Sequence, residues 1–248
     1  MPVNTWTPTA LASEARPWQG SGWRAVEAQH KISTMSLVHG SLADQAVLEA
    51  ILDEAKPLIP AAAQGLHWLL STPFRYYPLP GGSRFRGHND PGVFYGAEDR
   101  QTACAESGYW RLRMWMDSEG LAAKQKAVPL TLFEFHAASE RSIDLSLPPL
   151  IEDKAIWMHP HDYSGTQALA EQARAANIEV IRYQSVRHSG GNCLALLTPH
   201  VFKAVQEPYR NNQQSWTLLI QPPNLTVWQR DIAGESWAFQ FPVDSRLG

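Results

Sequence analysis

Three residues whose side chains could carry chemistry follow one another at equal steps of eleven positions: Arg84, Tyr95 and Glu106. A guanidinium group binds two phosphate oxygens at once, and a phenol ring offers a flat face for stacking. A carboxylate can stabilise the positive charge that develops on a sugar when its glycosidic bond breaks. Together, these three types of side chain would suit a dinucleotide.

The local sequence predicts which elements hold these residues. A turn at 90–92 separates two short runs, 83–86 and 93–97, whose composition is typical of strands. We therefore expect a hairpin. Alternate side chains share one face of a strand, so Arg84 and Arg86 would lie together and suit a pyrophosphate group.

A helix is predicted to follow, because Glu98 and Asp99 supply an acidic first turn. It would run to about Ser118, and its predicted packed stripe consists of Ala103, Trp110 and Met114. Glu106 shares a face with other polar residues, namely Asp99, Thr102, Arg113 and Asp117. Such a face is typical of solvated helix surface, so periodicity alone favours an ordinary role for Glu106. Tyr95, in a short apolar run, is equally typical of a core residue.

Read in order, these motifs resemble the RES domain, a family named for an arginine, a glutamate and a serine and found in toxins of bacterial toxin–antitoxin pairs. The family motifs match residues 82–85, 92–95 and 103–106, and the family serine corresponds to Ser185. Ser83 stands where many members have a second glycine. The resemblance covers roughly residues 20–205 and includes three further segments, 23–30, 56–57 and 162–164.

The resemblance implies an α+β fold similar to that of the ADP-ribosyltransferases, with a split β-core, flanking helices and NAD+ held in a crevice. NAD+ would be a substrate cleaved between nicotinamide and ribose, so no cofactor is expected. Glu106 would stabilise the charged sugar, Arg84 and Arg86 would bind phosphate, and Tyr95 would stack on nicotinamide. Ser185 has no neighbour in sequence to activate it, so it would donate a hydrogen bond to the ring or ribose. The family also implies an Xre-type antitoxin partner.

The sequence is compatible with three functions. The first is an NAD+-consuming toxin enzyme, a glycohydrolase or phosphorylase. The second is a mono-ADP-ribosyltransferase acting on a protein, which would need a second acid such as Glu98, Asp99 or Glu119. The third is a noncatalytic aromatic-rich binding module, since the chain has ten tryptophans.

The rest of the chain reads as a mixture of helices and strands. Helices are predicted from about residue 42 to 55, before Pro57, and from a capping box at 164–167 to Asn177, a residue that tolerates a left-handed cap. The predicted strands are 130–135, 178–186, 194–197, 216–220, 225–229 and 237–241. The second and third of these would pair as a hairpin, and the last three would extend a sheet or cover a site.

Composition limits the class of protein. A chain of 248 residues with 44% apolar side chains can bury one sizeable core, and we expect one RES-type domain over residues 1–248 with a strand-rich extension at 210–248. No apolar run approaches the length of a membrane span and no secretory signal is recognised, which predicts a cytoplasmic protein. A net charge of -3 without a basic run disfavours nucleic-acid binding. The oligomeric state stays open, a homo-oligomer included.

Two other features have residue types that could form reactive sites. The run His159-Pro160-His161-Asp162 has metal-binding residue types but no third ligand at a recognised spacing, so no metal is assigned. Cys104 and Cys193 lack the motifs of catalytic cysteines and are expected to be reduced core thiols.

Overall fold

The computed structural model describes residues 6–27, 38, 41–78, 80–121, 124, 126–202, 212–232 and 235–242. Residues 28–30 of the N-terminal RES-like segment and parts of the predicted 210–248 extension lie outside this set. Within the described ranges, no helix combines the length and apolar character needed to cross a membrane.

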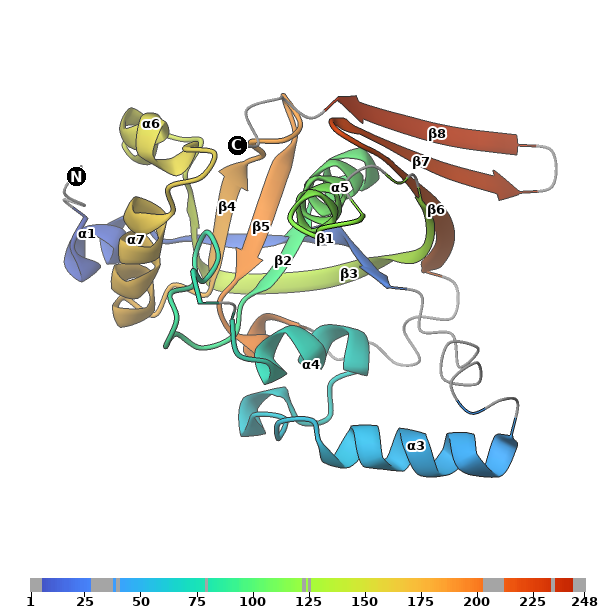
Figure 1. Cartoon of the computed structure of the whole chain (residues 1–248). Coiled ribbons are helices and arrows are strands. Elements are labelled where there is room, and N and C mark those ends of the chain that lie inside the picture. Colours follow the sequence, from blue (N-terminus) through green and yellow to red (C-terminus); the bar gives the residue numbers. More distant parts are fainter. Residues whose placement is uncertain are drawn as a thin grey trace.

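The described chain alternates helices with strands, which confirms the predicted α+β class (Figure 1). The helices are α1 (Pro8–Glu14), α3 (Leu42–Glu54), α4 (Trp68–Arg75), α5 (Arg100–Met116), α6 (Lys154–Trp157) and α7 (Ser164–Ala175). Short 3-10 turns are η1 (Ala61–Ala63), η2 (Leu150–Asp153) and η3 (Pro199–Val201). The strands are β1 (Arg16–Glu27), β2 (Phe94–Ala97), β3 (Lys126–Asp144), β4 (Val180–Gln184), β5 (Asn192–Leu196), β6 (Gln213–Gln221), β7 (Leu225–Ile232) and β8 (Glu235–Pro242).

The described strands form one sheet in the order β1-β2-β5-β4-β3-β6-β7-β8, and β1 also pairs with β3. Because β1 joins both β2 and β3, the first five strands of this order close on themselves. The β3–β4 pair is parallel, and β4 and β5 form the predicted antiparallel hairpin. The sheet therefore has a closed part around β1 to β5 and an open arm of β6 to β8.

Strand β3 holds the two parts together. It is 19 residues long, whereas the sequence predicted only residues 130–135. It pairs with β6 at its start, with β1 over most of its length, and with β4 through its last three residues. Small and polar residues such as Ala138 and Ser139 hide the strand pattern, and the long neighbour β1 supplies the hydrogen bonds that extend it.

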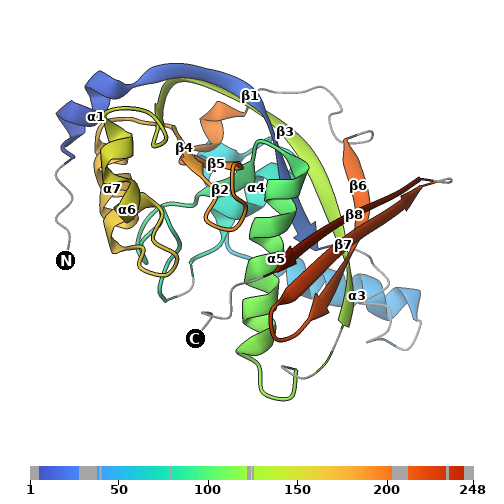
Figure 2. The ribbon, with the colours of Figure 1, turned by 90° about the horizontal axis from the view of Figure 1, so that it is seen from above.

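Helix α5 lies between the closed part of the sheet and the arm, as Figures 1 and 2 show from two directions. The arm approaches it closely at Gly108, where a Cβ atom would lie 2.9 Å from Thr226 Oγ1 and 3.0 Å from Trp228 Nε1. A residue with a side chain would push the arm away. The predicted tail strands thus extend the sheet, and they also cover one side of α5.

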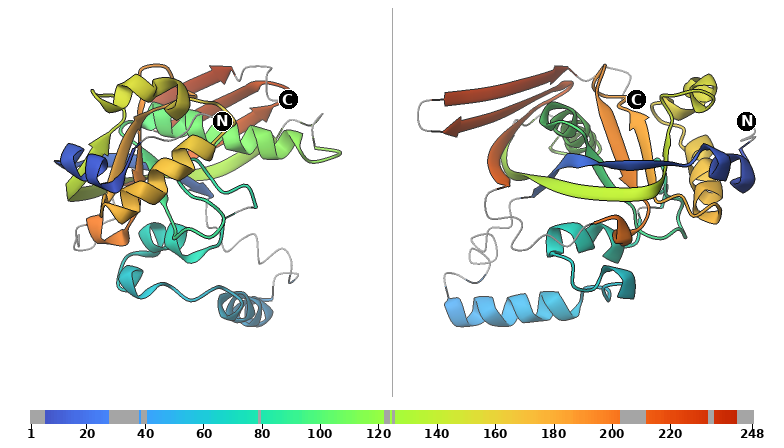
Figure 3. Two further views of the ribbon diagram at one scale, coloured as in Figure 1. Left: turned by 90° about the vertical axis from the view of Figure 1, so that its left-hand side faces the viewer. Right: turned by 180° about the vertical axis from the view of Figure 1, so that it is seen from behind.

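The remaining helices lie around the closed part of the sheet. Helices α1, α6 and α7 gather at one end, and α4 lies on the opposite side of the molecule from the arm, with α3 beyond it (Figure 3). The end of α7 is as predicted, since Asn177 has a φ of 54° in the left-handed region. The helix also begins at Ser164, where the capping box was predicted, but Tyr163 occupies the cap position without a side-chain hydrogen bond, so the capping box itself does not form.

Two local predictions near Arg84 and Trp110 are wrong. Residues 83–86 form a tight turn closed by a bridge between Ser83 and Arg86, and β2 pairs with β1 and β5 instead of with them. On α5, Ala103 is buried as predicted, but Trp110 and Met114 are exposed, while Cys104 and Leu112 are completely buried. The helix is thus rotated relative to the predicted stripe, because it packs against two layers at once.

Candidate functional site

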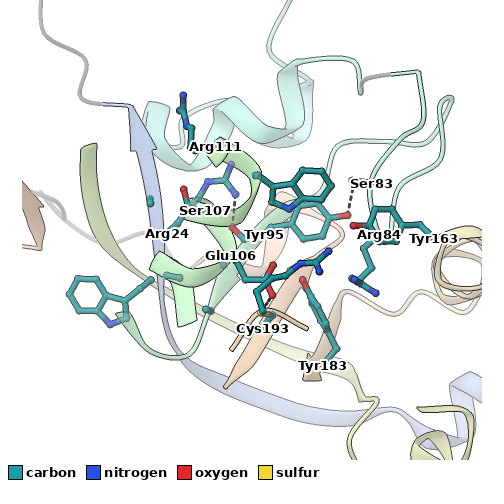
Figure 4. Close-up of a pocket in the computed structure, with 17 residues that line it drawn as sticks. Arg24, Ser83, Arg84, Tyr95, Glu106, Ser107, Arg111, Tyr163, Tyr183 and Cys193 are labelled. Carbon is teal, nitrogen blue, oxygen red and sulfur yellow. Dashed lines mark hydrogen bonds between the residues drawn. The ribbon is translucent and has the colours of Figure 1, made fainter. Parts of the chain in front are cut away.

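A cavity of about 280 Å³ opens beside α5, where β1, β2, the 83–86 turn and the loops after α6 and β4 meet (Figure 4). Its aromatic lining residues are Trp23, Tyr95, Trp110, Tyr163 and Tyr183. Its charged lining residues are Arg24, Arg84, Arg111, Arg187 and Glu106. The cavity thus brings together the three residues spaced at eleven positions, and its described lining residues include one carboxylate and four guanidinium groups.

Helix α5 positions Glu106. Asp99 precedes the first helical residue, and its Oδ1 accepts a hydrogen bond from the backbone N–H of Thr102 at 2.8 Å, which caps the helix start. Apolar residues such as Leu112 then fix the helix against the core. Glu106 lies two turns into the helix, at the wall of the cavity.

Ser185 forms a hydrogen bond with Glu106. Its Oγ–H donates to Glu106 Oε1 at 2.6 Å, and its Oγ accepts from the backbone N–H groups of Arg187 at 3.1 Å and His188 at 3.0 Å. Ser185 is only 4% exposed and is not among the residues that line the cavity. Its single proton is committed to the carboxylate, so this geometry favours a role in holding Glu106 over direct contact with a ligand.

Cys193 lies beside the same carboxylate. Its Sγ is 3.7 Å from Glu106 Oε1. Burial, and then the nearby negative charge of Glu106, raise the pKa of the Cys193 thiol well above its usual range. Cys104 is also buried and unpaired, and burial raises its pKa as well. Both residues are therefore neutral thiols at physiological pH. Of the two, Cys193 lines the cavity.

Tyr95 holds the 83–86 turn. Its hydroxyl is 2.8 Å from Ser83 Oγ and accepts a hydrogen bond from the backbone N–H of Phe85 at 2.9 Å. Burial raises the pKa of Tyr95, so the phenol stays neutral. Phe85 is fully buried with its ring 4.8 Å from that of Tyr183, a burial worth about 1.5–3 kcal/mol. The turn is anchored on that side, which leaves Arg84 at the cavity.

Arg84 and Arg86 point to different places, which corrects the expectation of a shared face. Arg84 lines the cavity, where its Nη1 donates to the carbonyl oxygens of Trp157 at 2.7 Å and His159 at 3.1 Å. Arg86 does not line the cavity; it donates to the carbonyl oxygens of Asp90 and Tyr76. Side chains of a turn do not alternate as those of a strand do, so only Arg84 reaches the site.

Three further arginines line the cavity without having been predicted from the sequence: Arg24, Arg111 and Arg187. Arg24 on β1 donates to the carbonyl oxygen of Tyr95 and lies 4.9 Å from the centre of the Phe94 ring; burial lowers its pKa to about 10. Arg187 donates to the carbonyl oxygen of Pro160 at 2.7 Å and lies 3.4 Å from the centre of the Tyr109 ring. The available signals were an arginine within the 23–30 segment and one two residues after Ser185.

The charge of the cavity is unbalanced. Within the described part of the chain, Arg24, Arg84 and Arg187 bond to backbone carbonyl oxygens and form no ion pair with a carboxylate. Only Arg111 pairs with an acid, Glu27, at the surface. Carbonyl dipoles do not neutralise a guanidinium, so three positive charges are available to an anionic ligand.

Glu98, Asp99 and the histidine run have structural partners. Glu98 makes a bidentate pair with Arg182 at 2.6 and 2.8 Å. Neither Glu98, Asp99 nor Glu119 lines the cavity. His159 Nδ1 accepts from the backbone N–H of Asp162 at 2.7 Å within a tight turn, and no group of three potential metal ligands occurs among the described residues.

Comparison with known proteins places these residues in a family. The model of the RES domain matches residues 59–221, which is more than half of the sequence. The chain belongs to the RES domain family. Arg84, Tyr95, Glu106 and Ser185 lie inside the matched RES region, whereas Arg24 precedes it.

More distant comparisons add little to the RES assignment. A search of the curated proteins finds no match. A solved structure described as the M. tuberculosis MbcT-MbcA toxin-antitoxin complex resembles the chain at 12% sequence identity and a TM-score of 0.46. The likeness covers 83% of this chain and 91% of that one, and it is too distant to carry an argument about function.

Proposed function

We propose that this RES protein is an enzyme that consumes NAD+ by cleaving the bond between nicotinamide and ribose. The observation that carries the proposal is the charge of the cavity: among the described residues, three guanidinium groups without a carboxylate partner are combined with one acid, Glu106. NAD+ has the complementary pattern, since its pyrophosphate is anionic and its nicotinamide ring is cationic.

The proposed reaction needs no redox step. The bond from ribose C1′ to the nicotinamide nitrogen breaks, and its electron pair leaves with neutral nicotinamide. The ribose then carries a positive charge of oxocarbenium type, which water or inorganic phosphate captures at C1′ with loss of a proton to solvent. The enzyme accelerates this step by binding the charged ribose more tightly than the substrate.

Glu106 is the group suited to stabilise that charge. Its Oε1 is held by Ser185, and its Oε2 has no hydrogen-bond donor among the described residues, so Oε2 is available to the ribose. Ser185 acts through Glu106 by fixing its orientation. The neighbouring thiol of Cys193 stays neutral and adds no competing charge.

Arg84 and Tyr95 take the roles of phosphate anchor and ring support. Arg84 uses Nη1 for two backbone carbonyl oxygens, and its Nε and Nη2 have no acceptor among the described residues. Those two donors form the fork that fits two phosphate oxygens. Tyr95 has its hydroxyl tied to the 83–86 turn, so its ring is held in one position at the cavity for stacking against nicotinamide. Arg86 is left out of the proposed site.

The biological role that fits this activity is that of a toxin held in check by an Xre-type antitoxin. Family membership supports this role, and an enzyme that destroys NAD+ without an inhibitor would poison its own cell. Transfer of ADP-ribose to a protein is the weaker alternative, because Glu106 is the one carboxylate among the described lining residues. A second acid to activate a protein nucleophile is missing from that set. The noncatalytic module is the third alternative and predicts no turnover.

The deciding experiment is incubation of the purified protein with NAD+, with and without phosphate, followed by identification of the products by mass. Free nicotinamide with ADP-ribose indicates hydrolysis, and nicotinamide with ADP-ribose 1″-phosphate indicates phosphorolysis. Intact NAD+ under both conditions, with a folded protein, would refute the proposed activity.

A further inference from the structure

Trp110 is an exposed aromatic side chain at the rim of the cavity. It is 44% exposed although it lines the site, whereas the helix pattern predicted it to be packed. It follows Glu106 by four residues on α5, and residues at this spacing share a helix face about 6 Å apart along the axis. Trp110 is thus one turn outward from the proposed catalytic carboxylate.

The neighbours of Trp110 keep its indole ring in place. The Tyr109 ring lies 5.3 Å away in an edge-on arrangement, and the Arg113 guanidinium lies 5.8 Å from the centre of the indole. The Tyr163 ring is 6.4 Å away, and Arg84 lies 4.7 Å over that same Tyr163 ring. An aromatic surface therefore adjoins the proposed phosphate anchor.

The size of the cavity indicates what this surface contacts. Its volume of about 280 Å³ is just below the roughly 300–1,000 Å³ found for pockets that enclose drug-sized ligands. NAD+ is larger than most such ligands. If the nicotinamide riboside half lies against Tyr95 and Glu106, the adenosine half must extend to the rim. A rigid, partly exposed indole is a suitable stacking surface for a purine base.

We propose that Trp110 stacks on the adenine base of NAD+ and makes the site selective for the dinucleotide over nicotinamide mononucleotide. The inference rests on the proposed cleavage of NAD+. Nicotinamide mononucleotide carries the same bond to nicotinamide and one phosphate, but it has no adenosine. It would use Glu106, Tyr95 and Arg84 without any contribution from Trp110.

The test measures KM and kcat for both nucleotides with the parent protein and with Trp110→Ala, Trp110→Phe and Trp68→Ala. Trp68 on α4 is the matched control, since it is 46% exposed and does not line the cavity. With NAD+, Trp110→Ala should raise KM by roughly 5- to 150-fold, the range expected for one base stacked on an aromatic ring. Its KM for the mononucleotide should stay within about twofold of the parent value. Trp110→Phe keeps an aromatic ring, so its KM for NAD+ should rise less than that of Trp110→Ala.

Each outcome decides the proposal. An unchanged KM for NAD+ in a folded Trp110→Ala protein overturns the adenine contact while leaving the proposed cleavage intact. An equal rise in KM for both nucleotides assigns Trp110 to the nicotinamide half of the substrate and also overturns the adenine contact. The same rise in KM for NAD+ in Trp68→Ala points to a general effect on the protein and also refutes the adenine contact. A parent protein that cleaves neither nucleotide overturns the proposed function together with this inference.

Discussion

Replacing Glu106 by glutamine changes the charge of the cavity with little change in shape. In the parent protein, Oε1 accepts a hydrogen bond from the Ser185 hydroxyl at 2.6 Å, which leaves Oε2 for the proposed contact with the ribose. The amide oxygen of glutamine must take the Oε1 position. Ser185 Oγ already accepts two backbone N–H groups, so its own O–H needs an acceptor, which an NH2 group cannot provide. The amide NH2 then replaces Oε2 and presents hydrogen-bond donors, not a negative charge, to the developing oxocarbenium ion.

The expected loss follows from this exchange. A preorganised group aimed at transition-state charge contributes on the order of a hundredfold or more to kcat, so NAD+ cleavage should fall by at least about a hundredfold, or about 2.7 kcal/mol. KM should change less than kcat, because the nicotinamide ring is cationic already on binding, whereas the charge on the sugar develops only in the transition state. The free energy of unfolding should change by less than about 1 kcal/mol, since glutamine keeps the volume and the bond to Ser185.

The assay is release of nicotinamide from NAD+ at saturating substrate, with urea unfolding of each variant. Glu171→Gln is the matched control, because Glu171 is exposed on α7 and does not line the cavity. It should keep the turnover of the parent protein. Near-parental turnover by a folded Glu106→Gln protein would remove Glu106 from the mechanism.

Three further outcomes are expected. Ser185→Ala should lower kcat for NAD+ by about tenfold at nearly unchanged KM, because it removes the bond that orients Glu106; a raised KM at parental kcat would instead assign Ser185 to ligand binding. Arg84→Lys should raise KM and reduce turnover together, because lysine cannot bind two phosphate oxygens in a fork, and parental kinetics would argue against a bidentate contact. Expression of the chain alone in a bacterial cytoplasm should deplete NAD+ and stop growth, while Glu106→Gln at equal abundance is tolerated. Growth arrest with unchanged cellular NAD+ would favour modification of a protein target.

Short-range chemistry made several features predictable. Asp99 begins α5 because its carboxylate bonds to the N–H of Thr102 three residues on, and Asn177 ends α7 because asparagine tolerates a positive φ. The β4–β5 hairpin follows from two apolar runs separated by a glycine-containing loop. These depend on residues close together in the chain, so the sequence is enough to predict them.

Long-range packing decided the orientation of side chains. Helix α5 buries residues on two sides, because it lies between the closed strands and the β6–β8 arm. A prediction with a single buried face could not describe this helix, and Trp110, which was predicted to be buried, is exposed. Long-range contacts hold the 83–86 turn as well, because Tyr95 and Gln167 bond to it, and in this turn Arg84 lies at the cavity whereas Arg86 does not.

The sequence by itself indicated the family and the residues of the candidate site: Arg84, Tyr95, Glu106 and Ser185 could be named from their motifs. Only the tertiary structure decided that Ser185 bonds to Glu106 across 79 positions and that Arg24 and Arg187 join the cavity. The reason is physical. A motif fixes the side chain and its local backbone, whereas the atom that it contacts is set by strand pairing and helix packing between segments far apart in the chain.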